Sequence, residues 1–242
     1  MALIIGRKPV LEAINSDRHI EQIYFRFGQK GEILNAIRAA AKKQKIKISE
    51  ISSKKFDEII TGKNSQGVAA RISERDYISL DELIVQSKTK EFPLFIILEE
   101  LQDVQNLGAI LRTAECSGVE GVIITKRNSA PLNETVSKIS AGAVEHLKIC
   151  QINNVVQSID TLKQNGYWII GSALDNSADY SNIDYNRPLV LIMGNEQKGI
   201  KKLTSEKCDH LINIPMYGKI QSLNVSVATG VILFEIKRQQ KK

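Results

Sequence analysis

Five short apolar runs alternate with helical patterns from residue 94 onward, and this alternation restricts the fold more than any other feature of the chain. The apolar runs are Leu94–Leu98, Val122–Thr125, Trp168–Gly171, Leu189–Met193 and Leu211–Ile214. A continuous apolar run is typical of a parallel strand that is buried on both faces. The helical patterns are Leu107–Ser117, Asn133–Val144, Val155–Gln164, Lys198–Lys207 and Ser222–Arg238. This order predicts an α/β fold in which helices cover both faces of a mostly parallel sheet.

The first 76 residues carry a second, smaller α/β pattern. Its predicted strands are Ile20–Phe25, Lys45–Ile51 and Gly67–Ile72. Its predicted helices are Glu32–Gln44, with Ile33, Ile37 and Ala40 on one face, and Ser53–Ile60, capped by Ser52 or Ser53. A polar connector follows, in which Ser79 can cap a short helix over Leu80–Val85 before the chain reaches Pro93. We therefore predict a small domain at 1–76, a linker at 77–93 and a larger domain at 94–242.

The excess positive charge is confined to the small domain. Residues 1–76 hold 15 basic and 9 acidic side chains, a net charge of +6, whereas residues 77–242 hold 18 of each. A basic module beside a neutral one suits a polyanion-binding domain joined to a catalytic domain. Lysine-rich helices can equally be solvated faces, so the charge alone leaves both interpretations open. The candidate contacts to such a polyanion are Arg7, Lys8, Arg26, Arg71 and Arg75.

Several classes of protein are disfavoured by what the sequence contains. The start of the chain does not read as a secretory signal, and no apolar run reaches the length of a membrane span. Three scattered cysteines and three scattered histidines predict buried thiols in a reducing cytoplasm and no metal site. No GxGxxG follows a strand, and the GNEQKG of residues 194–199 continues with Ile and Lys, which does not fit a phosphate-binding P-loop.

Polar residues follow three of the predicted strands. Asn106 and Arg112 come after the first apolar run, Glu196 follows Gly194 after the fourth, and Ser222 and Asn224 follow the fifth. Ligands of open α/β sheets bind in the crevice outside the carboxyl ends of the strands, so these residues are candidates for one site. Gly194 would let a ligand approach the backbone closely.

Each of these residues also has a structural interpretation. Asn106 and Ser222 can be helix N-caps, Arg112 a surface cation, and Glu196 a stabiliser of the following helix start. Asn224, inside the first turn, is less well explained by capping. In the last helix, Val227, Val231 and Phe234 recur at i, i+4 and i+7. That stripe is either core or a helix–helix interface between subunits.

Three segments together resemble a known family. In order and spacing they closely resemble the three motifs of SpoU-type RNA methyltransferases of the SPOUT superfamily. The segments are NLGAILRTAE, LIMGNEQKGI and IPMYGKIQSLNVSVATG. GRKPVLEAI near the start and NSQGVAA near residue 70 resemble the substrate-binding domain that precedes the catalytic domain in many members. That domain resembles a ribosomal-protein RNA-binding fold.

The resemblance implies a fold and a cofactor. The catalytic domain would be an α/β-knot, whose C-terminal part threads a deep trefoil knot. S-adenosylmethionine would lie in the knot against Gly194, Ile214 and Leu223. The protein would be a homodimer, and the C-terminal helix would contribute to its interface.

The resemblance also implies a reaction, in which a methyl group passes to a ribose 2'-hydroxyl, of a guanosine in 23S ribosomal RNA. Arg112 would be catalytic, and Asn106, Glu196, Ser222 and Asn224 would hold Arg112, the ribose and the phosphate. A guanidinium has a pKa above about 12, so we expect Arg112 to bind phosphate and stabilise the developing alkoxide, or to lose its proton only in the assembled site. A tRNA ribose methyltransferase and a non-catalytic RNA-binding protein remain the alternatives.

Overall fold

A computed structural model of the chain describes residues 2–16, 20–60, 65–72 and 77–240. The chain forms two compact units, and each is described by itself. Unit 1 comprises residues 1–76 together with 131–146, and unit 2 comprises residues 77–130 and 147–242. The predicted division at residue 76 lies outside the described residues, and segment 131–146 groups with the first unit.

Unit 1 contains a four-stranded sheet in the order β1-β4-β2-β3, in which only the β2–β3 pair is parallel. Its strands are β1 (Ala2–Ile5), β2 (Ile20–Arg26), β3 (Lys47–Ile51) and β4 (Val68–Ile72). Its longer helices are α1 (Arg7–Asn15), α2 (Glu32–Lys43) and α3 (Ser53–Ile59). The sequence prediction located β2, β3, β4, α2 and α3 but missed β1 and α1. Helix α1 begins directly after Gly6, whose φ of 106° turns the chain out of β1.

Both faces of the unit 1 sheet are buried. Neighbouring strand residues point to opposite sides, so Phe25 packs in the core on one face, with α1 and α2, and Tyr24 packs with Phe56 of α3 on the other. The residues predicted to form the buried face of α2 were partly wrong. Leu34 is buried, whereas Ile33 is 36% exposed. Both residues fit a helical stripe through Ile37, so only packing against the sheet decides between them.

The helix predicted over Asn133–Val144 is broken in the structure. Helix α6 spans Glu134–Ile139, and a 3-10 helix, η1, spans Ala143–His146. Between them Ala141 and Gly142 have φ values of 54° and 89°. A Cβ on Gly142 would lie 2.7 Å from the Glu12 Cβ, so this turn requires glycine to approach α1.

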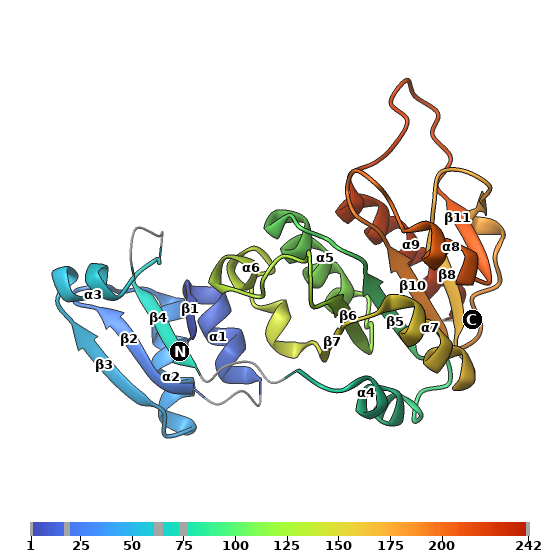
Figure 1. Ribbon diagram of the computed structural model, residues 1–242. Coiled ribbons are helices and arrows are strands. Elements are labelled where there is room, and N and C mark those ends of the chain that lie inside the picture. The colour runs from blue at the N-terminus through green and yellow to red at the C-terminus, as the bar shows by residue number, and fades with distance from the viewer. Residues whose placement is uncertain (1, 17–19, 61–64, 73–76, 241–242) are drawn as a thin grey trace. The chain divides into compact units, whose positions relative to one another are not determined.

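Unit 2 is built on a seven-stranded sheet in the order β7-β6-β5-β10-β8-β11-β9, and every pair in it is parallel (Figure 1). The strands are β5 (Leu94–Leu98), β6 (Gly121–Thr125), β7 (Ile149–Ile152), β8 (Trp168–Ser172), β9 (Ala178–Asp179), β10 (Leu189–Met193) and β11 (His210–Asn213). The helices are α4 (Leu80–Ser87), α5 (Val104–Cys116), α7 (Val155–Gln164), α8 (Lys202–Lys207) and α9 (Val225–Gln240), with a short 3-10 helix, η2, at Tyr180–Asn182. The five predicted parallel strands are confirmed, whereas β7 and β9 were missed.

The unit 2 sheet is covered on both faces, as the apolar runs predict. Residues of α4 and α7 pack with Phe95, Ile97 and Val190 on one face. Ile96 and Leu191 alternate with these residues, so they point to the other face, and they too are fully buried. Ser79 caps α4 as predicted and forms a capping box with Glu82, whose pKa is lowered by the hydrogen bonds with Ser79.

The prediction that all three thiols are buried was wrong for Cys116. Cys150 is buried and Cys208 partly buried, and burial raises their pKa values to about 11 and about 12. Cys116 is exposed at the end of α5. In the part of the chain that the structure describes, no helix has the length and apolar character needed to cross a membrane, and His, Cys, Asp and Glu side chains form no cluster suited to a metal ion.

Candidate functional site

A cavity of about 530 Å³ lies beyond the carboxyl ends of three adjacent strands of unit 2, β10, β8 and β11. Its walls are residues 193–200 after β10, residues 172–176 after β8, and residues between β11 and the first turn of α9. Gly194, Ile214 and Leu223, the three predicted cofactor contacts, all line this one cavity. Its volume is within the range of about 300–1,000 Å³ that is usual for small-molecule sites.

The loop after β10 closes tightly on itself. The backbone N–H of Asn195 donates to the carbonyl of Gly199 at 3.0 Å, and the N–H of Gly199 donates back at 2.9 Å. An ideal Cβ on Gly194 would lie 2.1 Å from the carbonyl carbon of Gly199. The close approach that requires glycine here is made by the chain's own backbone, and the predicted approach of a ligand to Gly194 stays a prediction. The helix predicted over Lys198–Lys207 begins only at Lys202, because this closed turn takes up its first residues.

Helix α5 begins earlier than predicted. Asp103 is its N-cap, and the Asp103 carboxylate accepts a hydrogen bond of 2.7 Å from the backbone N–H of Asn106. The interpretation of Asn106 as the N-cap was therefore wrong. Because Asp103 supplies the side-chain acceptor at the start of α5, the Asn106 side chain is available for other partners.

Asn106 joins the three predicted motifs in one hydrogen-bonded chain. Its Nδ2 donates to Glu196 Oε1 at 3.3 Å, and its Oδ1 accepts from Asn224 Nδ2 at 2.9 Å. Glu196 Oε1 also accepts from the backbone N–H of Asp103 at 3.2 Å. Glu196 therefore binds the start of α5 and does not stabilise α8, which begins six residues later.

Asn224, and not Ser222, caps the last helix. Helix α9 begins at Val225, and Asn224 Oδ1 accepts from the backbone N–H of Ser226 at 2.9 Å. The capping interpretation of Ser222 was therefore wrong. Ser222 lies in the preceding loop, is exposed and lines the cavity.

Arg112 is not brought into this network. It lies on α5, is exposed, and makes no hydrogen bond or ion pair with any residue that the structure describes. It is also not among the residues that line the cavity. Its guanidinium is therefore free to bind a partner that approaches the protein surface.

The predicted apolar stripe on the last helix is not core. Thr229, Ile232, Leu233 and Ile236 form the buried face of α9, which packs against α5. Val227 and Phe234 are 51% and 55% exposed. Of the two interpretations of this stripe, the core interpretation was wrong.

The loop after β8 is a part of the site that the sequence reasoning missed. Leu174, Asp175 and Asn176 line the cavity. The rule that ligands bind beyond the carboxyl ends of strands would have found them, because the strand that ends at Ser172 was itself predicted.

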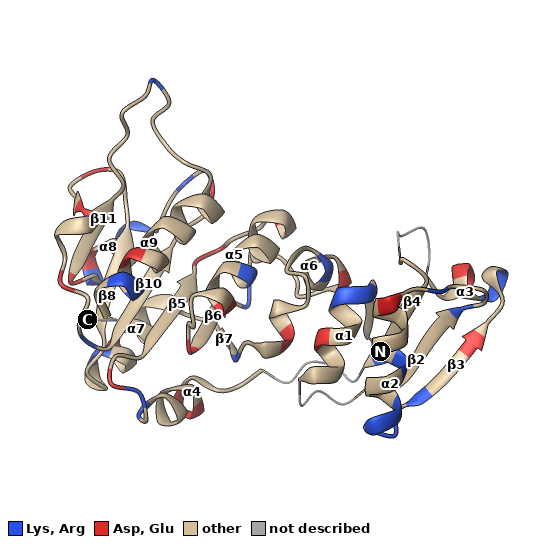
Figure 2. Ribbon diagram, turned by 180° about the vertical axis from the view of Figure 1, so that it is seen from behind, with Lys and Arg blue, Asp and Glu red and all other residues tan. Residues whose placement is uncertain are grey.

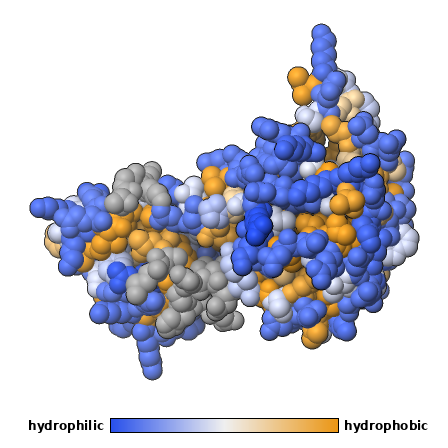
Figure 3. Space-filling view, in the orientation of Figure 1, coloured by the Kyte–Doolittle hydropathy of each residue, from blue (hydrophilic) through white to orange (hydrophobic). Residues whose placement is uncertain are grey.

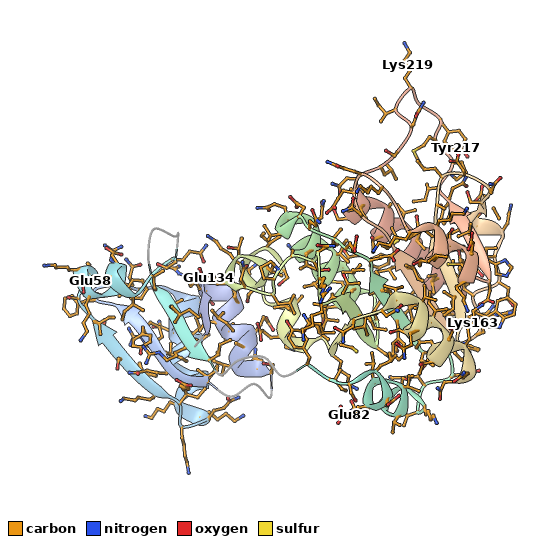
Figure 4. The ribbon with its side chains drawn as sticks, viewed as in Figure 1. Glu58, Glu82, Glu134, Lys163, Tyr217 and Lys219 are labelled. Carbon is orange, nitrogen blue, oxygen red and sulfur yellow. The ribbon has the colours of Figure 1, made fainter. Side chains whose placement is uncertain are left out.

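The loop between β11 and α9 extends away from the rest of unit 2 (Figures 1 and 4). Its two ends line the cavity, whereas Tyr217 near its tip is 97% exposed and Ile220 is 76% exposed. Lys219 stands at the tip, and polar and apolar side chains occur together on this loop (Figures 3 and 4).

The lining fits a small molecule that combines an apolar ring with polar and positively charged groups. Leucine, isoleucine and methionine side chains supply apolar surface, and Asp175 and Glu196 supply carboxylates. S-adenosylmethionine carries a purine, ribose hydroxyls, an ammonium, a carboxylate and a sulfonium. The donor set is thus compatible with that cofactor.

Comparison with known proteins agrees with this geometry. Residues 93–234 match the SpoU rRNA Methylase family, and residues 3–78 match the family model described as RNA 2'-O ribose methyltransferase substrate binding. A Bacillus subtilis (strain 168) protein, named as a member of the TrmH family of tRNA/rRNA methyltransferases, is 40% identical over 98% of this chain and 95% of its own length.

Two solved structures are also similar. The crystal structure of an AdoMet-bound rRNA methyltransferase from Sinorhizobium meliloti has a TM-score of 0.83 and 27% identity, covering 98% of this chain and 87% of that one. An A. aeolicus TrmH/SpoU tRNA modifying enzyme has a TM-score of 0.57 and 34% identity, covering 67% and 82%. The chain therefore belongs to the SpoU rRNA methylase family and is an S-adenosylmethionine-dependent RNA 2'-O-methyltransferase.

Proposed function

We propose that this enzyme methylates the ribose 2'-hydroxyl of a guanosine in 23S ribosomal RNA, in the cytoplasm, and that the cavity of unit 2 is its active site. The observation that carries the site assignment is the hydrogen-bonded chain from Asn224 through Asn106 to Glu196 beside that cavity. It joins three segments that are far apart in sequence. Gly194, Ile214 and Leu223 are the proposed cofactor contacts.

S-adenosylmethionine supplies an electrophilic methyl group, so the protein's task is to position the acceptor and to assist loss of its proton. Held against Gly194, Ile214 and Leu223, the cofactor would supply its methyl carbon to the 2'-oxygen and leave as S-adenosylhomocysteine, and the hydroxyl proton would pass to solvent. Asn106, Glu196, Ser222 and Asn224 hold the ribose and its phosphate at the cavity mouth. Correct positioning can lower a barrier by up to about 7–11 kcal/mol in the best intramolecular cases.

Arg112 binds the phosphate next to the target ribose in this proposal. Its guanidinium is exposed and has no partner among the residues that the structure describes, which suits bidentate contact with phosphate. Its positive charge would stabilise the negative charge that develops on the 2'-oxygen.

The C-terminal part of unit 2 is proposed to form the trefoil knot. The closed turn of residues 195–199 and the following segment to α9 both line the cavity, which is compatible with one threading past the other. A crystal structure with S-adenosylhomocysteine tests this directly, since a chain path that does not thread, or a ligand away from Gly194, would contradict the proposal.

Ribosomal RNA is the favoured substrate over tRNA because the substrate-binding family model covers residues 3–78 and the Sinorhizobium meliloti structure that matches the whole length is described as an rRNA methyltransferase. The tRNA alternative is favoured by the A. aeolicus enzyme, which matches 67% of this chain. Mapping 2'-O-methyl groups in both RNA classes from a strain lacking this protein decides between them. Loss of a site in tRNA alone would overturn the ribosomal assignment.

Unit 1 is proposed to bind the RNA backbone, and its basic residues occur both on its helices and on strands β2, β3 and β4 (Figure 2). Among the candidates, Arg7 binds Gln66, Arg26 pairs with Asp57, and Arg71 lies over the Tyr24 ring. Lys8 is exposed at the start of α1, and Arg75 lies outside the described residues. Lys8 is therefore the clearest candidate for a phosphate contact.

Replacing Lys8 with glutamine is expected to weaken RNA binding and to reduce the slope of log K against log salt concentration by about 0.7–0.9, the value for one lost phosphate contact. Filter binding at several salt concentrations measures this slope. Lys88→Gln removes the same charge from an exposed position of unit 2 and serves as the control. An unchanged slope in Lys8→Gln would remove Lys8 from the interface.

A homodimer through α9 is proposed from the exposed apolar side chains of Val227 and Phe234. Val227→Lys is expected to raise the dimer dissociation constant by about 100-fold or more, because an unpaired charge would be buried. Light scattering after gel filtration measures the mass. Val85→Lys changes another exposed valine, on α4, and should leave the mass unchanged. A wild-type protein that is monomeric at all concentrations would contradict the proposal.

A further inference from the structure

Glu99 is a buried carboxylate that the mechanism above does not use. It follows β5, its residue is 1% exposed, and both of its oxygens accept hydrogen bonds. Oε2 accepts from the backbone N–H of Lys201 at 2.9 Å, and Oε1 accepts from Thr204 Oγ1 at 2.7 Å. Thr204 is also 1% exposed, so the pair lies inside the fold.

These contacts reach the end of the loop that lines the cavity. The loop, here called the cofactor loop, comprises residues 194–200, and Lys201 is the next residue. The beginning of the same loop is held by the same short segment, because the Glu99 N–H donates to the carbonyl of Met193 at 2.9 Å and the Glu100 carbonyl accepts from Asn195 Nδ2 at 3.0 Å. Residues 99 and 100 therefore fix both ends of the cofactor loop.

Glu100 strengthens the attachment on the outer side. Its Oε1 accepts from Lys201 Nζ at 2.6 Å, and this contact lowers the pKa of the Glu100 carboxyl. The ion pair of Glu100 with Lys201 lies at the surface and contributes little to stability by itself. Glu99 is different, because a buried carboxylate is very unfavourable unless donors satisfy it. The chain thus strongly favours the one arrangement in which the Lys201 N–H and the Thr204 hydroxyl reach it.

We propose that Glu99 is a positioning residue that holds the cofactor loop in the shape that binds S-adenosylmethionine. The loop contains no helix or strand of its own between Gly194 and Lys201 apart from the Asn195–Gly199 bridge, so its shape depends on its anchors. The inference rests on the proposed assignment of this cavity as the cofactor site. Glu99 itself is not among the cavity-lining residues and acts through the loop.

The test compares three substitutions by calorimetry with S-adenosylhomocysteine and by steady-state kinetics. Glu99→Ala is expected to raise the Kd for S-adenosylhomocysteine and the KM for S-adenosylmethionine by about 10- to 100-fold, the range for lost hydrogen bonds to a charged group. The kcat at saturating cofactor and the KM for RNA should change by less than about threefold. Glu99→Gln should bind nearly as wild type, because its amide oxygen can accept from Lys201 and its amide nitrogen can donate to Thr204. Thr204→Val removes one of the two bonds and should give an intermediate Kd.

Glu120 provides a matched control. Its carboxylate also accepts a backbone N–H, that of Leu94 at 2.7 Å, but at the amino end of β5, away from the cofactor loop. Glu120→Ala should lower the thermal midpoint without changing cofactor affinity. Equal loss of affinity in Glu120→Ala and Glu99→Ala would show a general structural effect and overturn the proposal.

Wild-type cofactor affinity in a folded Glu99→Ala or Thr204→Val variant would also overturn it. If Glu99→Ala fails to fold, the cofactor affinities of Thr204→Val, Glu99→Gln and Glu120→Ala still test the proposal. It requires weaker binding in Thr204→Val than in the other two variants. A wild-type protein that binds S-adenosylhomocysteine at a different place would instead refute the assignment of the cavity, so the two failures are distinguishable.

Discussion

Replacing Arg112 with alanine is expected to lower the rate of methyl transfer by about 100- to 1,000-fold while the affinity for S-adenosylmethionine stays within about threefold of wild type. The guanidinium is exposed, lies outside the cavity lining and has no partner among the described residues, so the folded chain and the cofactor do not depend on it. In the proposed mechanism, its loss would remove only stabilisation of charge on the phosphate and the 2'-oxygen. Single-turnover methylation with saturating RNA measures the rate, and calorimetry measures cofactor binding.

Arg112→Lys is the informative companion to the alanine variant. Lysine keeps the charge but loses the planar fork, so partial recovery of the rate would indicate a charge contact and no recovery a bidentate one. Thermal unfolding should show both variants to be as stable as wild type. Methylation at the wild-type rate in Arg112→Ala would remove this residue from the mechanism.

Gly194→Ala is expected to weaken cofactor binding, with a rise in Kd of about 5- to 150-fold. A Cβ at this position would lie 2.1 Å from the Gly199 carbonyl carbon and 2.2 Å from the Ile200 nitrogen. Both are backbone atoms and cannot rotate away as a side chain could. The closed turn of the cofactor loop must therefore open, and overpacking of this kind destabilises by about 1–3 kcal/mol.

Gly218→Ala is the matched control for Gly194→Ala. Gly218 lies in the loop before α9, and a Cβ added there meets no atom within 4 Å. Its cofactor affinity should equal that of wild type. If Gly194→Ala binds S-adenosylhomocysteine as tightly as Gly218→Ala does, the loop geometry described here does not govern binding.

The elements that the sequence predicted well share a local cause. The continuous apolar runs predicted β5 and β10 to the residue, and α7 was also predicted with its observed ends. A strand of a parallel sheet that is buried on both faces consists almost entirely of apolar residues, so it can be recognised from its own sequence. Strand β7 (ICQI) is short and contains a polar residue, so its sequence did not predict a strand.

Choices between neighbouring residues of similar chemistry needed the tertiary structure. Asp103 and Asn106 are both residue types that often cap helices, and they lie three residues apart. In the structure Asp103 is the N-cap, and the Asn106 side chain instead bonds with Asn224, 118 positions away in sequence. In the same way, Val227 and Ile232 are both apolar residues of α9, and only the packing of that helix shows which of them is buried.

The sequence by itself determined the class of fold and the family, because these follow from short patterns within single segments, and the family resemblance implied the contacts Gly194, Ile214 and Leu223 that line the cavity. The tertiary structure alone decided how the segments meet: that Asn106 connects Glu196 to Asn224, that Arg112 stays outside the cavity, and that Glu99 holds the cofactor loop. The physical reason is that hydrogen bonds and close packing between distant residues depend on distances of a few tenths of an ångström, which no local periodicity specifies.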